Sequence, residues 1–183
     1  MGGEGRIVSQ LLSRALIPLA VELGKQNPFA NVEEEAFVGI VRTATVLKGQ
    51  VNRVLRSFRL AEPSYNVLRI LRGAGPEGRC SHEITAQVIS EVPDMTRLID
   101  RLQRLGLCER RRMDGDRRLV RVVITSAGLE LLLELDTAIT TLHRQQLAGI
   151  PAEVLEQMLE SLTLVRTTAQ RAPHSPAKSH WPA

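Results

Sequence analysis

The stretch PDMTRLIDRLQRLGLCERRRMDGDRRLVRVVIT, residues 93–125, decides the fold of this chain. Over 93–105 its apolar residues recur three and four positions apart, and this spacing predicts an amphipathic helix. Two short strands, 107–111 and 119–124, are then predicted on either side of the turn at 113–116. The stretch is therefore expected to form a helix followed by a β-hairpin.

Positive charge gathers in the same stretch. Residues 93–121 hold nine arginines against five acidic residues, so the formal net charge of +4 arises here and the rest of the chain sums to zero. A run of charged residues such as this one can also lie on an ordinary solvent-exposed surface without any binding role. On a helix and a hairpin, however, the concentration of charge favours nucleic-acid binding.

Outside this stretch, apolar periodicity predicts further helices on both sides. Pro18 falls inside the first of them and is expected to kink or split it. Ser81 is expected to cap the short helix that precedes residue 93. The predicted helices are 6–24, 33–59, 63–73, 82–89, 126–147 and 151–171, and a flexible tail follows them.

Composition excludes several classes of protein. The chain is 43% hydrophobic but only 3% aromatic, which favours helices packed through aliphatic side chains. The two cysteines and four histidines show no disulfide or metal-ligand spacing, and no phosphate-binding loop or nucleophile motif occurs. No run of 18 apolar residues appears. We therefore expect a cytoplasmic protein without cofactor, metal or membrane span, and not an enzyme.

The predicted helix that Pro93 opens carries candidate DNA contacts on its outward face, because a major groove admits such a helix. Thr96 and Arg97 are placed to reach base edges, and Arg101 or Arg104 to reach phosphates. An ordinary amphipathic helix with a solvated basic face would show the same pattern. The inward set is Leu98, Ile99, Leu102 and Leu105, and the outward set is Asp94, Met95, Thr96, Arg97, Asp100, Arg101 and Arg104.

The predicted hairpin supplies the second group of candidate contacts. Asp116 lies beside Arg117 and Arg118, and a carboxylate can hold an arginine in one orientation through paired hydrogen bonds. An arginine held in this way could enter a minor groove. A salt bridge that only stabilises the hairpin remains open, and both interpretations can hold together. Arg112, before the turn, completes the candidate residues.

Over roughly residues 33–168 the sequence resembles the multiple-antibiotic-resistance regulator (MarR) family. The most specific part is Asp116-Arg-Arg followed by Ile124-Thr-x-x-Gly128. The residues that carry the resemblance are Glu34–Phe37, Arg42–Ala44, Tyr65–Leu71, Glu83–Ala86, Pro93–Leu102, Leu105–Leu107, Asp114–Leu119, Val123–Thr125 and Gly128.

The resemblance implies a mainly α fold with a small β-hairpin wing, namely a winged helix-turn-helix with a helical dimerisation region. It implies that Asp94 to Arg97 lie in the major groove and that Asp116 orients Arg118. It also implies a homodimer on a pseudopalindromic operator in double-stranded DNA, and a small aromatic or phenolic effector bound between the two regions. The expected division is an N-terminal extension with a short helix (1–32), a first long helix of the dimerisation region (33–60), the winged helix-turn-helix (61–125), C-terminal dimerisation helices (126–171) and a flexible tail (172–183).

The sequence thus predicts a sequence-specific transcription regulator, a repressor released by a small molecule. The alternative is a winged-helix module for protein assembly that binds no specific DNA, because one fold can host unrelated functions. The extension over residues 1–32 exceeds the usual start of the family, and we expect its helix to dock on the dimerisation region.

Overall fold

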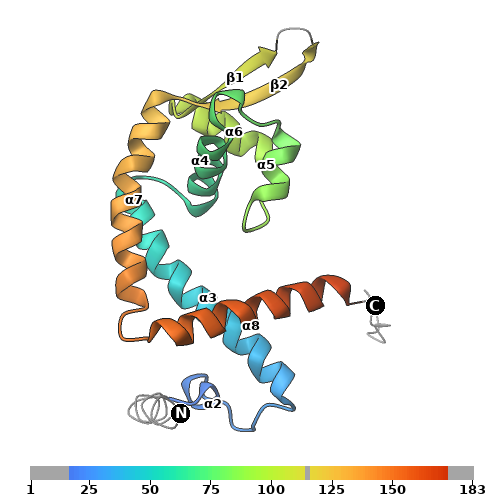
Figure 1. The fold of residues 1–183 in the computed structure, drawn as a ribbon, viewed down its shortest axis with the longest axis vertical. Helices are drawn as coiled ribbons and strands as arrows, with labels where there is room; N and C mark the ends of the chain where they lie inside the picture. Colours follow the sequence, from blue (N-terminus) through green and yellow to red (C-terminus); the bar gives the residue numbers. More distant parts are fainter. Residues whose placement is uncertain (1–16, 114–115, 173–183) are drawn as a thin grey trace. The chain divides into compact units, whose positions relative to one another are not determined.

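The structure is a computed structural model that describes residues 17–113 and 116–172, without the side chains of 113–119. Within the described residues, the short helix α2 (Leu19–Glu22) is followed by nine elements, in the order helices, hairpin, helices (Figure 1). They are α3 (Val32–Ser57), α4 (Glu62–Ala74), the 3₁₀ turn η1 (Gly75–Glu77), α5 (Ser81–Gln87), α6 (Met95–Arg104), β1 (Cys108–Met113), β2 (Asp116–Ile124), α7 (Ser126–Gln146) and α8 (Ala152–Arg171). The mainly helical fold with one β-hairpin is the fold class that the sequence predicts.

The two helices before the hairpin differ at their ends from the predicted ones. The helix expected over 82–89 begins one residue earlier and ends at Gln87, so Ser81 is its first residue and Cys80 precedes it. The amide of Cys80 donates to the Glu83 carboxylate at 2.7 Å, which fixes this start. The helix expected from Pro93 begins only at Met95, because the side chain of Asp94 caps it.

The N-terminal extension is described from residue 17 onward. It contains the short helix α2 (Leu19–Glu22), which begins after Pro18, so the helix predicted over 6–24 does not run through this proline. Glu22 accepts a hydrogen bond from Arg42 of α3 at 2.7 Å. The described part of the extension thus contacts α3, in the region expected to form the dimer.

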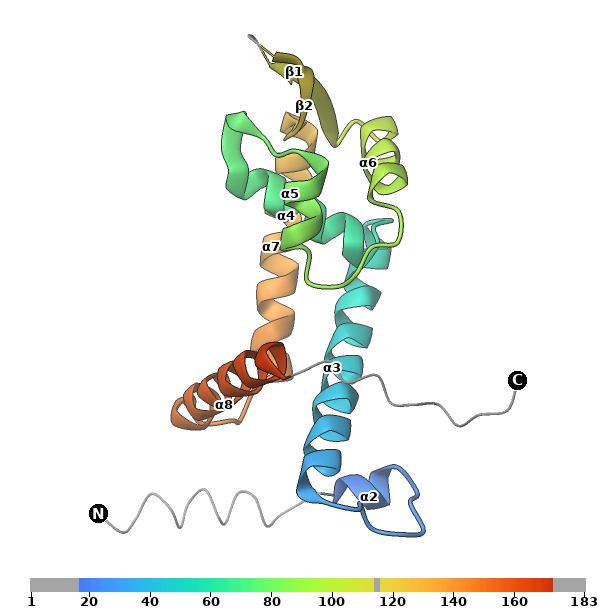
Figure 2. The same cartoon turned by 90° about the vertical axis from the view of Figure 1, so that its right-hand side faces the viewer.

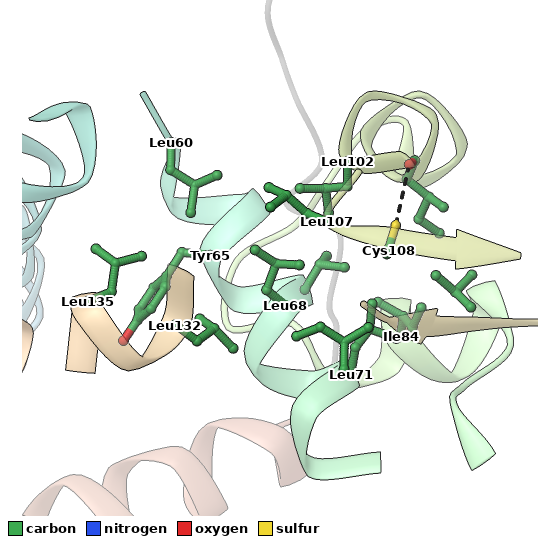
Figure 3. Close-up of a cluster of buried hydrophobic side chains, with 14 of the residues drawn as sticks. Leu60, Tyr65, Leu68, Leu71, Ile84, Leu102, Leu107, Cys108, Leu132 and Leu135 are labelled. Carbon is green, nitrogen blue, oxygen red and sulfur yellow. Dashed lines mark hydrogen bonds between the residues drawn. The ribbon is translucent and has the colours of Figure 1, made fainter. Parts of the chain in front are cut away.

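The chain divides into two compact units between Leu142 and His143. The first unit holds the core, in which α4 contributes the fully buried Leu68 and Leu71 (Figure 3). Leu102 of α6 and Leu132 and Leu135 of α7 pack into the same cluster. Helix α4 therefore connects the helix that precedes the hairpin with the helix that follows it.

The hairpin β1–β2 is antiparallel and projects beyond α4, α5 and α6 (Figure 2). Both strands are longer than predicted. Arg79 forms an isolated β-bridge with Val122 of β2, with amide-to-carbonyl distances of 3.0 and 2.8 Å. Gly78 precedes it at φ +62°, and a Cβ there would lie 2.3 Å from the Val122 carbonyl oxygen, so only glycine fits this close approach.

Polar contacts tie neighbouring elements of the first unit together. Lys48 of α3 donates to Ser90 Oγ in the α5–α6 connection and pairs with Glu62 of α4, both at 3.0 Å. Arg72 of α4 holds Asp136 of α7 through two hydrogen bonds of 2.6 and 3.2 Å. None of the described helices is both long enough and apolar enough to cross a bilayer.

Candidate nucleic-acid interface

The start of α6 is fixed by its own cap. Asp94 Oδ1 accepts the amide hydrogen of Arg97 at 2.9 Å, and Asp94 Oδ2 lies 3.1 Å from Arg97 Nε. The carboxylate thus satisfies one free amide of the first turn and also pairs with a guanidinium. The Arg97 side chain is 89% exposed, so it projects into solvent from the first turn.

The buried face of α6 differs from the predicted one. Met95 was expected to face outward, but it is buried together with Ile99 and Leu102, at the i, i+4, i+7 spacing of one helix face. Leu105 was expected inside, yet it is 54% exposed, because α6 ends at Arg104 and Leu107 fills the core in its place. Met95 is therefore removed from the candidate DNA contacts.

The other candidates on α6 are accessible. Thr96, Arg101 and Arg104 are exposed, and neither of these arginines makes an ion pair within the described residues. Asp100, also expected outside, is half-buried and pairs with Arg110 of β1 at 2.6 Å. This pair and the bond from Arg110 to Gln103, also 2.6 Å, fix β1 against α6.

The arginines of the hairpin fall into two groups. Arg110 and Arg111 are neutralised by acidic neighbours, the latter by Glu109 at 2.6 Å. Arg112 is exposed and has no ion pair with a described residue. The pairing with β2 becomes irregular between Arg112 and Met113, directly before the predicted turn.

The tip of the hairpin is only partly described. Residues 114–115 lie outside the described residues, and of Asp116, Arg117 and Arg118 the backbone alone is described, within β2. The contact that we expect between Asp116 and Arg118 therefore remains a prediction. Pro93 is exposed and lies before the cap of α6.

Two further arginines, Arg79 and Arg121, belong to none of the predicted sites but have partly buried side chains. Arg121 Nη1 donates to the carbonyl of Gly78 at 3.3 Å, which ties β2 to the chain before α5. The Nε atoms of Arg79 and Arg121 are buried and have no hydrogen-bond partner among the described residues. The pKa of Glu83 is lowered mainly by the Cys80 amide, and these two arginines lower it further. No hydropathy pattern marks them, because one lies on an isolated bridge and the other among many arginines.

Neither a metal site nor a reactive thiol is present at this surface within the described residues. They hold no group of three or more histidine, cysteine or acidic side chains that could bind a metal. Cys80 and Cys108 are both buried. Burial raises the pKa of Cys108 to about 11, so this thiol stays protonated near neutral pH.

No protein-family model matches the chain. Solved structures do match it, including a MarR transcription factor from Planctomyces limnophilus at 35% identity and a TM-score of 0.57, covering 75% of this chain and 99% of that one. The fold is also similar to CouR from Rhodococcus jostii RHA1 bound to p-coumaroyl-CoA (24% identity, TM-score 0.64, 75% and 95% covered). It is likewise similar to Sco3205 from Streptomyces coelicolor, a MarR family regulator in complex with DNA (16% identity, TM-score 0.67, 83% and 96% covered).

Proposed function

The chain belongs to the MarR family of transcription regulators, and we propose that it binds a pseudopalindromic operator in double-stranded DNA as a homodimer. Membership of a family of regulators agrees with the expectation that the chain is not an enzyme. The observation that carries the proposal is the outward face of α6, where Thr96, Arg97, Arg101 and Arg104 are exposed. The matched structure with DNA, Sco3205, supports the same use of the fold.

In this proposal α6 enters the major groove. Thr96 and Arg97 lie in its first turn and contact base edges, while Arg101 and Arg104, further along, contact phosphates. Asp94 positions Arg97 instead of reading a base, because its carboxylate is occupied by the Arg97 amide and guanidinium. Lys48 holds Ser90, five residues before α6 begins, and so restrains the connection that leads into this helix.

The hairpin supplies the second contact in the proposal. Arg112, Arg117 and Arg118 flank its tip, where an arginine can enter a minor groove. We expect Arg118→Ala to weaken operator binding several-fold. The matched control is Arg111→Ala, which removes an exposed arginine of the same hairpin that Glu109 already neutralises. Unchanged affinity of Arg118→Ala would contradict the role assigned to the wing.

We further propose that the regulator is a repressor that a small aromatic molecule releases from DNA. Two observations support a small aromatic effector. The chain belongs to the MarR family, and the matched CouR structure holds p-coumaroyl-CoA, a thioester with a phenolic acyl group. In this proposal residues 33–60 and 126–171 form the dimerisation region, and residues 61–125 form the DNA-binding region.

The experiment that tests the function is a fluorescence-anisotropy titration of the full chain with DNA from the promoter beside its own gene. Nanomolar affinity, a steep loss of affinity with added salt and a clear preference over scrambled DNA are expected. Scrambled DNA bound as tightly as promoter DNA would contradict sequence-specific regulation through that promoter. Binding of a protein partner that survives high salt would instead favour the assembly module.

A further inference from the structure

We propose that Lys48 of α3 is a positioning residue for DNA binding, which acts by holding the connection between α5 and α6 through Ser90. Its ammonium group donates to Ser90 Oγ at 3.0 Å and lies 3.0 Å from Glu62 Oε1. One side chain of the proposed dimerisation region thus joins the start of α4 to the segment that leads into α6. This role rests on the proposed function, since it concerns how the exposed face of α6 is held to meet DNA.

The connection from Val88 to Asp94 has few other anchors. Helix α5 ends just before it, and the residue that caps α6 lies at its far end. Val92 packs in part against the core, whereas Ile89 is 75% exposed. Apart from the capping residue, only Ser90 in this segment has a side chain that makes a hydrogen bond or an ion pair with another described residue. The link to Lys48 is therefore the polar anchor of the connection.

Glu62 holds the ammonium group of Lys48 in place. The Glu62 side chain is only 17% exposed and lies in the first turn of α4, where the positive end of the helix dipole favours a carboxylate. A lysine has a flexible stem, and this ion pair restricts it. The ammonium group carries three donor hydrogens, so it can serve Glu62 and Ser90 at the same time. Lys48 is consequently directed at the connection.

The link reaches the outward face of α6 through a short piece of chain. Ser90 lies in the same connection as Asp94, whose carboxylate caps α6 and pairs with Arg97. A shift of Ser90 therefore displaces the first turn of α6, where Thr96 and Arg97 are proposed to meet base edges. Hydrogen bonds weaken steeply when donor and acceptor are misaligned. Loss of the link should weaken binding to the operator more than binding to unrelated DNA, which depends on phosphate contacts.

Direct contact of Lys48 with a phosphate is the alternative role, since its side chain is 45% exposed. A phosphate would then have to compete with the Glu62 carboxylate, which already neutralises the ammonium group. The two roles differ in what Ser90 contributes. A phosphate contact is lost when Lys48 alone is replaced, and its loss lowers the salt slope of binding by about one. A positioning role is lost equally when Ser90 is replaced, and the salt slope stays unchanged.

Anisotropy titrations of the full chain with promoter DNA, arranged as a double-mutant cycle, test the role. Lys48→Met and Ser90→Ala are each expected to weaken binding about five- to tenfold, and the double variant no more than either alone. Ser90→Ala leaves the pair between Lys48 and Glu62 intact, so its effect cannot come from an unpaired carboxylate. Ser90→Thr, which keeps the hydroxyl group, should retain the affinity. The matched control is Lys25→Met, which removes the same charge from an ion pair with Glu34 and should leave the affinity unchanged.

Hydrogen exchange of the same chains without DNA measures the restraint on α6 directly. The Arg97 amide, which Asp94 caps, should exchange severalfold faster in Lys48→Met and in Ser90→Ala than in the natural chain, whereas the amides of α7 should exchange at unchanged rates.

The two readouts separate this role from the proposed function. Specific binding of promoter DNA with affinity unchanged in Ser90→Ala would overturn the positioning role alone, as would a salt slope lowered by about one in Lys48→Met. A natural chain without preference for promoter DNA, combined with faster exchange in both variants, would contradict the regulator and leave the restraint on α6 established. Unchanged exchange in both variants would contradict the restraint itself.

Discussion

At the scale of single residues, Asp94 decides where α6 begins. Its carboxylate both caps the Arg97 amide and pairs with the Arg97 guanidinium. We expect Asp94→Ala to lower the free energy of unfolding by about 1 kcal/mol, because the cap is lost, whereas Asp94→Asn keeps the cap and nearly all of the stability. Urea unfolding of the two variants measures the difference. Equal stability of the alanine and asparagine variants would contradict the capping role.

Cys108 makes stability depend on alkaline pH. Burial raises the pKa of its thiol from 9.0 to about 11, so the folded state keeps a proton that the unfolded state has already released. The thiol's contribution is fully present below about pH 9 and is lost as pH rises through about 11, up to roughly 2–3 kcal/mol. We expect Cys108→Val to lose less stability than the natural chain between about pH 8 and pH 10.5 in urea unfolding. A parallel pH dependence in both chains would contradict this assignment.

Met95 and Leu105 show what the sequence could and could not predict at this scale. The helix itself and its buried Ile99 and Leu102 follow from the apolar spacing. The inward position of Met95 depends on a helix start two residues later than Pro93, and a side-chain cap determines that start. Leu105 is exposed because the helix ends just before it. Hydropathy specifies a face, but the caps specify which residues belong to it.

At the scale of elements, the first turn of α7 packs closely against Leu107, just before β1, and against Ile124, the last residue of β2. A Cβ on Gly128 would lie 2.3 Å from the Leu107 carbonyl oxygen and 2.7 Å from Ile124 Cγ1. We expect Gly128→Ala to lower the free energy of unfolding by about 2–3 kcal/mol, because neither backbone nor core can easily yield. Thermal unfolding followed by circular dichroism measures the change.

Gly49 is the matched control for that substitution. It also lies in a helix, α3, but nothing lies within 4 Å of a Cβ built there. Gly49→Ala should therefore raise stability by about 0.5–1 kcal/mol through better helix propensity. A Gly128→Ala chain as stable as Gly49→Ala would mean that α7 can move away from Leu107.

Elements were easier to predict than the contacts between them. The bounds of α3, α4, α7 and α8 follow from periodicity together with Pro and Gly signals, within a few residues. The β-bridge at Arg79 could not be predicted, because a single residue has no period and its pairing with Val122 joins distant parts of the chain. For the same reason, the sequence did not reveal the hydrogen bond from Lys48 to Ser90.

At the scale of the whole molecule, apolar surface remains uncovered in each unit. Phe37 on α3 is 68% exposed and Leu133 on α7 is 71% exposed, and in the second unit Leu164 on α8 is 69% exposed. Exposed apolar residues in such number mark interaction surfaces. A two-fold dimer covers the same surface on both copies and sets half-sites about 10 base pairs apart.

We therefore expect the natural chain to sediment as a dimer and Phe37→Glu to sediment as a monomer at micromolar concentration, since a buried carboxylate without a partner disfavours association. Leu105→Glu is the control, because Leu105 is also exposed but lies at the end of α6, outside the regions assigned to dimerisation. Analytical ultracentrifugation distinguishes the three chains.

The monomer should also bind operator DNA more weakly and with a shallower salt dependence, because one copy neutralises fewer phosphates. A Phe37→Glu chain that remains dimeric would place the interface elsewhere than on the first half of α3, and a monomeric natural chain would contradict two-fold recognition of the operator.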